Sequence, residues 1–469
     1  MQKIQKLLKK HNQSHLLSFS KQLSSEQKEK LLSQLKKLDF EKIDHWVETL
    51  VNNHPLETVP TYFEPADYYP AVPEDDQLKE KYNKAGKLGK QLLSEGKVAA
   101  FVVAGGQGTR LGFDGPKGNC PISPVKNKTL FQIFAEKIAS ASKKYNTILP
   151  WYIMTSPMNH DQTSEIFLNN NYYGLDKSNV FIFEQGTLPN FDFEGNILLA
   201  DKDKLALSPN GHGGSISALY DSGAAEDMKR RGIELISYFQ VDNPLIHIFD
   251  PLFIGLHVLD KSQMSSKALA KEKPKDKVGN FCLVDGKVTV IEYSDLPDEL
   301  AKKRKPDGTL VFNLGSIAIH IINRTFVEQL NAKGFALPLH RAVKKIPHID
   351  ENGDYINPSE PNGVKLESFI FDALPLADKS IILETLKEQE FAPLKNANGI
   401  SGPDDVRQRM TARDAEWLES AGIKVPKKPD GSINATIEIT PSFALEKEDM
   451  KEKIDNVPEI KPGAQIYLE

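Results

Sequence analysis

The strongest constraint on the fold is a short apolar segment, VAAFVVA at residues 98–104, which ends at a glycine-rich loop. A continuous apolar run of this length is typical of a strand that is buried on both faces of a sheet. Three further runs, WYIMTS, VFIFEQG and GIELISYFQVDNP, follow it, with helical segments between them. Strands that alternate with helices favour parallel pairing and helices on both faces of the sheet. We therefore expect an α/β protein with a central, mostly parallel, doubly wound sheet.

The chain on either side of this region has a different character. Before residue 96 the apolar spacing is helical, with Ser24 and Gln27 placed to form a capping box and Asp39 placed to cap a second helix. After residue 390, Pro403 suits the first turn of a helix, and the runs ATIEI and AQIYL suggest late strands. We predict a helical N-terminal domain at 1–95, a central domain at 96–390 and a small α+β C-terminal domain at 391–469.

Composition excludes several classes of protein. A net charge of -5 and a pI near 6.2 argue against a broad electrostatic grip on nucleic acid. The two cysteines, Cys120 and Cys282, lie in no CxxC or Cys/His cluster, which argues against a disulfide framework or a zinc site. The N-terminal segment does not have the pattern of a secretory signal, and no window approaches the roughly 20 apolar residues of a membrane span. We expect a soluble cytoplasmic protein that binds neither nucleic acid nor membranes.

The glycine-rich loop, AGGQGTRLGFDGPKG at 104–118, has the composition of an anion site. Gly105, Gly106 and Gly108 permit a positive φ and a close approach of the backbone to a ligand. Consecutive amide groups in such a loop can hold phosphate oxygens. Arg110 offers a planar fork of donors, and Lys117 offers a mobile point charge.

Two common phosphate-binding motifs do not fit this loop. A Walker A loop requires Gly-Lys-Ser/Thr at its end, and no such sequence occurs here. A dinucleotide fingerprint matches at Gly106 and Gly108, but Leu111 stands where the third glycine is needed. The structural alternative, a tight strand-to-helix turn with exposed basic side chains, stays open on composition alone.

The same loop resembles the signature loop of the sugar-nucleotide pyrophosphorylases. Its Pro-Lys-Gly spacing resembles that of the eukaryotic-type UDP-N-acetylglucosamine pyrophosphorylases. The resemblance continues in family order from about residue 100 to 400, whereas the N-terminal part and the extreme C-terminal part match less clearly. The motifs that carry it are TLFQIFAEKI, WYIMTS, EQGTLP, PNGHGG, VDNPL, VIEYSDL, FNLGSIA, KKIPHID, PNGVKLESFIFD and EFAPLKNA.

This resemblance implies a Rossmann-like nucleotidyltransferase sheet, with the UTP and sugar sites in the central, catalytic domain. The implied reaction converts UTP and a sugar 1-phosphate into UDP-sugar and pyrophosphate, through in-line attack of an already anionic oxygen on the α-phosphorus. Such catalysis rests on positioning and charge stabilisation, with no general base required. Arg110, Lys117 and Lys395 are the implied catalytic residues, Mg²⁺ is the implied cofactor, and we expect a monomer or a weak homo-oligomer.

Asp242 is the candidate ligand for Mg²⁺. It ends the run YFQVD, and open α/β sheets place their ligands at the carboxyl ends of strands. A carboxylate suits Mg²⁺, which usually keeps water and takes further ligands from phosphates. The alternative is an Asp-Asn-Pro turn at the end of a strand, and in either case we expect Asn243 to shape the turn.

The remaining candidates are substrate-binding residues that the resemblance implies. The amide of Gln185 would pair with uracil, together with the backbone of Gly105 and Gly106. The structural alternatives are a polar loop for Gln185, the solvent face of a strand for Glu292, a turn for Asn313 and an exposed side chain for the lysine. Separately, we expect Asp372 to end a strand-like run, FIF. The other substrate-binding candidates are Gly211 and His212 for the nucleotide, Gly279, Glu292 and Asn313 for the sugar, and Lys365 as a second basic contact.

Two positions leave the identity of the sugar open. Acetylglucosamine enzymes commonly have a sequence similar to GNGG at the motif PNGHGG, whereas glucose and broad UDP-sugar enzymes have one similar to GHGD. This chain has the histidine of the second pattern, His212, and the final glycine of the first. We expect His212 to contact a ligand rather than transfer a proton. The motif FNLGSIA places Ser316 where FNAGNIA is usual. The main hypothesis is UDP-N-acetylglucosamine synthesis. The alternatives are a UDP-glucose or broad-specificity pyrophosphorylase, a nucleotide-sugar-binding protein without turnover and, more weakly, a nicotinamide oxidoreductase.

Overall fold

The computed structural model describes residues 2–53 and 60–469. The chain groups into two compact units, each built from three separate segments. Unit 1 contains Met1–Thr61, Gln185–Ser215 and Ala336–Asp372, and unit 2 contains Tyr62–Glu184, Ile216–Phe335 and Ala373–Glu469. The division into three consecutive domains, with boundaries near residues 95 and 390, stays a prediction.

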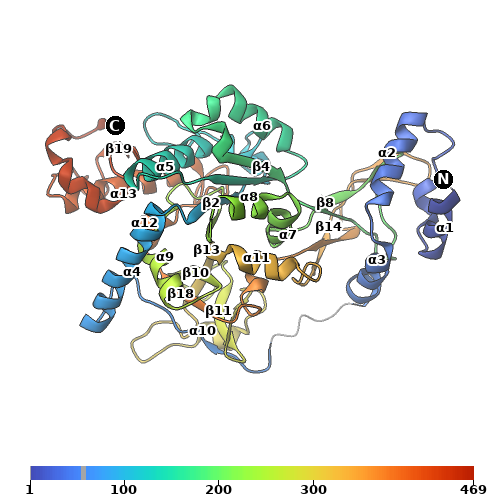
Figure 1. Cartoon of the computed structure of the whole chain (residues 1–469), viewed down its shortest axis with the longest axis horizontal. Coiled ribbons are helices and arrows are strands. Elements are labelled where there is room, and N and C mark those ends of the chain that lie inside the picture. The colour runs from blue at the N-terminus through green and yellow to red at the C-terminus, as the bar shows by residue number, and fades with distance from the viewer. Residues whose placement is uncertain (1, 54–59) are drawn as a thin grey trace. The chain divides into compact units, whose positions relative to one another are not determined.

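Unit 2 is built on a ten-stranded sheet (Figure 1). Four neighbouring strands run parallel in the order β9-β2-β3-β4. They are β9 (Leu235–Gln240), β2 (Val98–Val103), β3 (Trp151–Thr155) and β4 (Val180–Glu184). All six residues of β2 are buried, as the apolar run predicts for a strand covered on both faces.

The other side of the sheet mixes strand directions. The long strand β13 (Leu314–Asn323) is antiparallel to β9 and also pairs with β10 (Met264–Ala270) and β11 (Asn280–Val284). Strand β18 (Ser380–Glu384) pairs with β10 in the parallel direction. The predicted mostly parallel α/β sheet is confirmed. The remaining strands, both antiparallel to β11, are β12 (Lys287–Ile291) and β1 (Glu64–Pro65).

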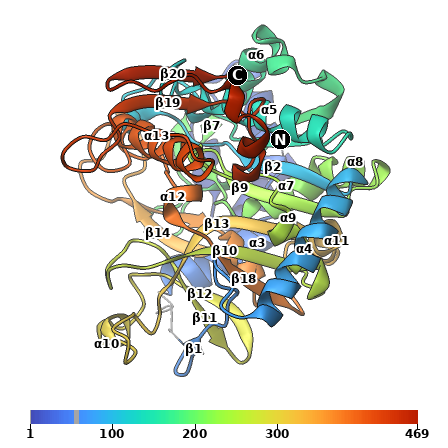
Figure 2. The same cartoon turned by 90° about the vertical axis from the view of Figure 1, so that its left-hand side faces the viewer.

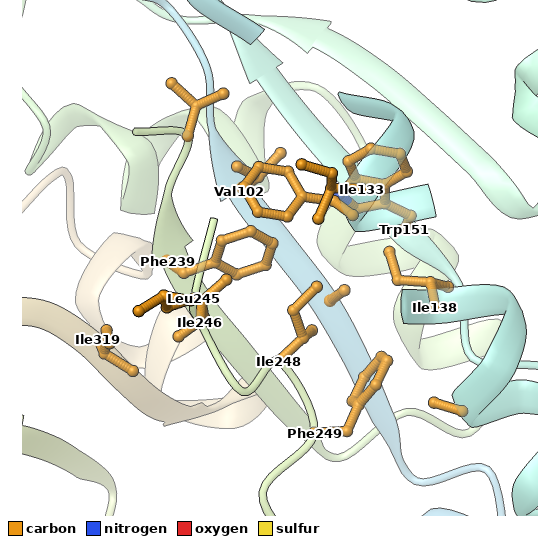
Figure 3. Packing of buried hydrophobic residues seen from close by; sticks show 14 of the residues in the cluster. Val102, Ile133, Ile138, Trp151, Phe239, Leu245, Ile246, Ile248, Phe249 and Ile319 are labelled. Atoms are coloured by element: carbon orange, nitrogen blue, oxygen red, sulfur yellow. The ribbon is translucent and has the colours of Figure 1, made fainter. Parts of the chain in front are cut away.

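Helices cover both faces of this sheet, and successive side chains of a strand point to opposite faces and pack on different helices. On β3, Trp151 and Ile153 belong to a core cluster with the helices of one face, whereas the Tyr152 hydroxyl donates to Asp227 of α8 on the other face at 2.7 Å. Figure 3 shows part of this core around Val102 and Trp151. The helices of the first face are α4 (Asp76–Ser94), α5 (Leu130–Lys144), α6 (His160–Asn169) and α9 (Pro251–Leu259); α8 (Ala224–Arg230) and α11 (Arg324–Asn331) pack together on the second.

Two local features of unit 2 follow from the residue types at a turn and at a helix start, and the second of them was predicted. The Asp285-Gly286 turn joins β11 to β12, and both residues have positive φ, 49° and 74°, as a type I′ hairpin requires. Pro403 occupies the first turn of α13 (Pro403–Ser420). Helix α13 packs against the parallel pair β19 (Ala435–Ile439) and β20 (Ala464–Leu468), and together they form a separate hydrophobic cluster (Figure 2).

Unit 1 combines N-terminal helices with short antiparallel strands. Ser24 and Gln27 form the predicted capping box, and the Asp39 carboxylate accepts from the Lys42 amide. Leu31 and Phe191 share one hydrophobic cluster, so the helices pack on segments that lie far away in the sequence. The helices are α1 (Gln2–Lys10), α2 (Ser25–Lys36) and α3 (Phe40–Trp46), and the main strand pairs are β5 (Thr187–Pro189) with β8 (Leu207–Pro209) and β14 (His340–Lys344) with β17 (Gly363–Glu367).

No helix in the described part of the chain combines the length and the apolar character that crossing a bilayer needs.

Candidate active site

The glycine-rich loop leaves the carboxyl end of β2 and closes on itself. The Gly108 amide donates to the Gly115 carbonyl at 2.9 Å, and the Lys117 amide donates to the Gly106 carbonyl at 3.0 Å. Gly112 and Gly115 adopt positive φ, 68° and 123°, and supply the turns. The loop is therefore a fixed backbone structure that returns Lys117 to the point where the loop began.

Gly105, Gly106 and Gly108 do not use the positive φ that glycine permits, and the left-handed positions lie further along the loop. Gly108 has φ of -79°, and glycine is needed there for space: a Cβ would lie 2.7 Å from the Phe113 carbonyl oxygen. At Gly106 a Cβ would meet nothing within 4 Å. The backbone at Gly106 therefore presents a clear face to a ligand.

Two polar side chains after β3 hold the carbonyl groups of the loop. The Ser156 hydroxyl donates to the Gly105 carbonyl at 2.9 Å, and the Asn159 amide donates to the Ala104 carbonyl at 2.9 Å. Among the described residues, the amides of Gly105 and Gly106 donate to no backbone carbonyl. This arrangement of fixed carbonyls and available amides is the one that an anion site requires.

Two predicted basic residues lie in this loop and a third follows a residue that contacts it, and none of the three charges is paired in the described part of the chain. Arg110 is exposed and Lys117 is partly buried; the Lys117 ammonium donates to the Leu394 carbonyl at 3.2 Å. Lys395, the next residue, is exposed. Within the ranges that the structure describes, none of the three forms an ion pair. Their charges are available to a ligand, as the functional interpretation requires.

Asp242 lies directly beyond β9, beside the same segment. The Leu394 amide donates to the Asp242 carbonyl at 2.8 Å, so Leu394 contacts both Asp242 and Lys117 through its backbone. The Asp242 carboxylate is partly buried, with no hydrogen bond or ion pair to another described residue. No group of three or more metal-ligating side chains exists in the described chain. A lone carboxylate fits Mg²⁺, which takes its other ligands from water and phosphate.

Asn243 shapes the turn after β9, as predicted, and it also holds the C-terminal segment in place. Its side-chain oxygen, Oδ1, accepts from the Leu245 amide at 3.3 Å and from the Ala392 amide at 3.0 Å. Its amide donates to the Glu390 carbonyl at 2.7 Å. The segment that carries Lys395 is thus fixed to the strand end that carries Asp242.

The predicted sugar-binding residues come together at one end of β11, β12 and β13. A Cβ on Gly279 would lie 3.2 Å from the Glu292 carboxylate, so these two residues are adjacent. The Gly279 carbonyl accepts from the Ser316 amide at 2.8 Å, and Asn313 precedes β13. The contacts of these side chains with a sugar stay a prediction.

The sequence interpretation did not identify Lys271 beside this group. Its amide donates to the Asn313 carbonyl at 2.6 Å, and its ammonium donates to the Asn280 side-chain oxygen at 2.5 Å. Lys271 is buried, and burial lowers the pKa of its ammonium group. The only signal in the sequence was a second lysine four residues after Lys267, in a segment that reads as a buried strand.

In unit 1 the structure brings together two of the predicted nucleotide contacts. The buried Gln185 side chain donates to the Gly211 carbonyl at 2.5 Å and to the Asn210 side-chain oxygen at 3.0 Å. Gly211 has φ of 85°, and a Cβ there would lie 2.2 Å from the Ser368 carbonyl oxygen. Only glycine fits this position.

His212 is held in a stack of rings. Its ring lies 5.4 Å from that of Phe369, which in turn lies 4.6 Å from that of His340. The His212 Nδ1 accepts from the Ile370 amide at 3.1 Å. Burial, and to a smaller extent His340, lower the pKa of His212 to about 4. His212 is therefore neutral, with its proton on Nε2, which agrees with the expectation that it transfers no proton.

Two expectations in this part of unit 1 change. The FIF run was expected to be a strand ended by Asp372, but it forms a 3₁₀ turn, Ile370–Ala373, because the Asp372 carboxylate accepts from the Phe369 amide at 3.3 Å. The Lys365 ammonium lies 3.3 Å from the Glu367 carboxylate, so its charge is paired. The predicted contact of Lys365 with substrate stays a prediction.

Comparison with known proteins places these residues in a family context. Residues 65–467 match the family described as UTP–glucose-1-phosphate uridylyltransferase. The human UDP-N-acetylhexosamine pyrophosphorylase-like protein 1 is 35% identical over 96% of this chain and 94% of its own length. The UDP-N-acetylglucosamine pyrophosphorylase of Saccharomyces cerevisiae is 39% identical over 73% of this chain and 74% of its own length.

A solved structure is also similar to this chain. The crystal structure of the uridine diphosphate N-acetylglucosamine pyrophosphorylase from Trypanosoma brucei, in complex with an inhibitor, matches with a TM-score of 0.82 and 25% identity. The match covers 98% of this chain and 96% of the Trypanosoma chain. The similarity therefore extends over both compact units.

Proposed function

The chain belongs to the UTP–glucose-1-phosphate uridylyltransferase family, and from this premise we propose that it is a UDP-N-acetylglucosamine pyrophosphorylase. It would transfer the uridylyl group of UTP to N-acetylglucosamine 1-phosphate and release pyrophosphate. The names of the relatives with 35% and 39% identity support the acetylated sugar. The family description, which names glucose, is the coarser match.

The observation that carries the proposal is the set of groups at the carboxyl ends of β2 and β9. The available amides of Gly105 and Gly106, the unpaired charges of Arg110 and Lys117 and the lone carboxylate of Asp242 are what a triphosphate and its cation need. Open α/β sheets bind ligands at this edge.

In the proposed reaction an oxygen of the sugar phosphate attacks the α-phosphorus of UTP. The new P–O bond forms as the bond to the bridging oxygen breaks, and the electron pair leaves with pyrophosphate. Arg110, Lys117 and Lys395 would stabilise the negative charge that moves onto the leaving group. The attacking oxygen is already ionised, so the neutral His212 has no proton to remove.

Asp242 is the residue that would hold Mg²⁺. When bound, the ion would neutralise phosphate charge and orient the triphosphate. The protein contribution is the position of the carboxylate, which the backbone bonds at Leu394 and Val241 fix at the end of β9.

The test is an assay of pyrophosphate release by the purified chain with UTP, Mg²⁺ and a panel of sugar 1-phosphates. We expect N-acetylglucosamine 1-phosphate to give the highest kcat/KM, with N-acetylgalactosamine, glucose and galactose 1-phosphates as comparisons. A preference for glucose 1-phosphate, or equal rates on several sugars, would support the alternative that His212 and Ser316 raise. Release with none of them would leave a nucleotide-sugar-binding protein without turnover.

A cytoplasmic location and a monomeric or weakly oligomeric state are further parts of this proposal. Both cysteines, Cys120 and Cys282, are buried and free, which supports a reducing compartment. Cell fractionation and light scattering of the purified chain test these two points separately.

A further inference from the structure

Unit 2 contains a cavity of about 470 Å³, lined by both apolar and charged side chains, which none of the predicted site residues lines. Its walls come from α5, from the segment 245–252 after Asn243, from the segment 383–390 before Leu394, and from α13 and the residues near 446. A volume of this size falls in the range of pockets that hold small organic molecules. The cavity therefore has room for a ligand and shares walls with the segments that carry the candidate active site.

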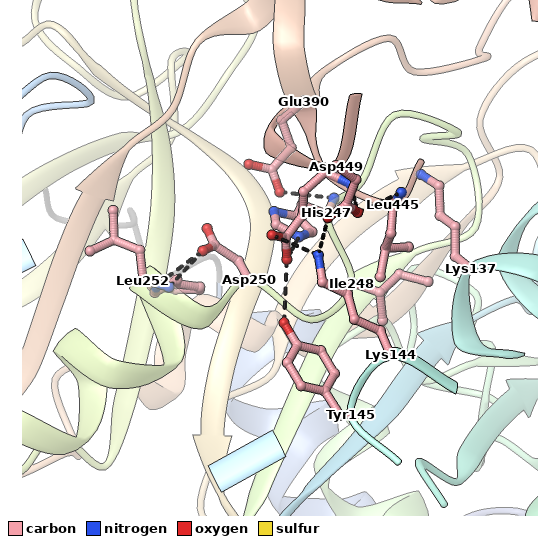
Figure 4. Close-up of polar contacts among 12 residues, drawn as sticks. Lys137, Lys144, Tyr145, His247, Ile248, Asp250, Leu252, Glu390, Leu445 and Asp449 are labelled. Carbon is pink, nitrogen blue, oxygen red and sulfur yellow. Dashed lines mark hydrogen bonds and ion pairs between the residues drawn. The ribbon is translucent and has the colours of Figure 1, made fainter. Parts of the chain in front are cut away.

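Three of the acidic side chains that line the cavity, Asp250, Glu390 and Glu446, are paired with bases, whereas Glu384 accepts from the Ala71 amide and Glu448 is exposed. Lys267 is 2% exposed, and its ammonium lies 2.7 Å from the Asp250 carboxylate and 2.5 Å from the Glu390 carboxylate. The Glu446 carboxylate lies 3.1 Å from the Lys144 ammonium and 3.7 Å from the His247 ring. Figure 4 shows polar contacts in this part of unit 2, with His247, Asp250 and Glu390 among the labelled residues. The charges of Asp250, Glu390 and Glu446 are therefore already compensated within the protein.

Lys137 differs from the other charged groups of the cavity. Its ammonium donates to the carbonyls of Pro244 and Ile246, both at 2.7 Å, and forms no ion pair within the described chain. Burial, and then the neighbouring charge of Arg413, hold the pKa of Lys137 well below its usual value. Lys137 is partly buried and has no carboxylate within ion-pair distance, so a bound anion would favour the charged form that burial disfavours.

Arg413 supplies a second donor to the same cavity. Its Nε and Nη2 lie 2.8 Å and 2.6 Å from one oxygen of Asp414, and its guanidinium lies 4.5 Å from the centre of the Trp417 ring. Among the described residues Nη1 has no contact of this kind. Trp417 and Leu245 add an apolar wall that suits the carbon skeleton of a ligand.

We propose that this cavity binds a small organic anion, a phosphate ester or a carboxylate, through Lys137 and Arg413. The bound anion would contact the ammonium that holds the carbonyls of Pro244 and Ile246, directly after Asn243. Because Asn243 fixes the Glu390–Ala392 backbone ahead of Lys395, occupancy of the cavity changes the support of the candidate active site. This second step rests on the proposed function, whereas the binding step does not.

The binding test uses calorimetric titration of the full chain with glucose 6-phosphate, gluconate and glucose. These probes carry a phosphate, a carboxylate and no charge on similar skeletons, so they identify the anionic group. We expect one or both anions to bind and glucose not to bind. Lys137→Met should weaken that binding about 10- to 100-fold, the value of one charge-assisted hydrogen bond. Lys137→Arg, which keeps the charge, should retain it, and melting temperatures would show that both variants fold.

Two further variants separate this cavity from other anion sites. Lys143→Met removes an exposed lysine from the same helix and should leave binding unchanged. Lys117→Ala removes a cation of the glycine-rich loop and should also leave it unchanged. Loss of binding in Lys117→Ala, unchanged binding in Lys137→Met, equal binding of glucose, or no binding of either anion at millimolar concentration would each overturn the proposal.

The coupling is measured as the change in kcat or KM for pyrophosphate release when the bound anion is saturating. A change in the native chain that is absent in Lys137→Met supports the coupling, and identical kinetics with and without the anion refute it. An inactive chain without any probe is a failure of the proposed function, and the calorimetric result is independent of it.

Discussion

The turn residue Asn243 offers the sharpest test of how the candidate site is held together. Its side chain makes three hydrogen bonds: with the Glu390 carbonyl, the Ala392 amide and the Leu245 amide. The side chain is 5% exposed, so water cannot replace these bonds. A net contribution of about 0.5–1.5 kcal/mol for each of the three bonds gives a loss of about 1.5–4.5 kcal/mol of unfolding free energy for Asn243→Ala.

Such a loss leaves the protein folded, because domains of this kind are stable by roughly 5–15 kcal/mol. The functional effect is larger than the stability suggests. Freed from Asn243, the segment that carries Lys395 can move relative to Asp242, and a displacement of ~1 Å in a catalytic group can cost ~100-fold in rate. We expect kcat to fall by at least about tenfold.

The assay is urea unfolding, to give the midpoint and slope, together with steady-state kinetics of pyrophosphate release. Asn396→Ala is the matched control, since Asn396 is exposed and donates one bond, to the Ile400 carbonyl in the same segment. The control should change stability by no more than about 0.5 kcal/mol. A midpoint for Asn243→Ala equal to that of the control, or an unchanged kcat in a destabilised variant, would refute the reasoning.

The other predictions concern charge. Lys117→Ala should lower kcat by ~10²–10³-fold, as loss of one transition-state donor does, with an unchanged urea midpoint; an unchanged rate would remove Lys117 from the site. Asp242→Asn should raise the Mg²⁺ concentration for half-maximal rate at least about tenfold, and wild-type metal dependence would place the ligand elsewhere. For His212, the lowered pKa of about 4 means that the neutral ring stabilises the fold fully above pH 6.5 and loses that contribution as pH falls toward 4, by up to about 3 kcal/mol. Urea midpoints of His212→Asn should lack this component, and parallel pH profiles of the two proteins would contradict the assignment.

Local chemistry in the sequence predicted much of the fold. The apolar run of β2, the Asp285-Gly286 turn and the Ser24 cap each depend on neighbours within a few residues, so their signals are complete in the sequence. The α/β class follows from the order of such elements. The prediction of a strand at FIF was wrong although its neighbours are also local. The apolar, β-favouring triplet indicated a strand, but the Asp372 carboxylate accepts from the Phe369 amide and the segment forms a turn.

The candidate site could not be predicted in full from the sequence because its residues are held by long-range contacts. Sequence reasoning identified Lys117, Asp242 and Lys395 as candidates, but the residues that hold them are recognisable only in three dimensions. Asn159 lies 53 or more residues from the carbonyls to which it donates, and Leu394 lies more than 100 residues from both of its partners. No spacing rule in the chain connects such positions.

The double role of Leu394 has a consequence for how this sequence can vary. Both of its bonds to the site use the peptide group, so the chemical identity of its side chain does not matter to them and another buried apolar residue can serve. The length of the chain between Glu390 and Lys395 does matter. Insertion or deletion of a single amino acid there would shift the Leu394 backbone out of register with Asp242 and Lys117 and break both hydrogen bonds. Across related enzymes, we expect this stretch to tolerate substitution and to keep a constant length.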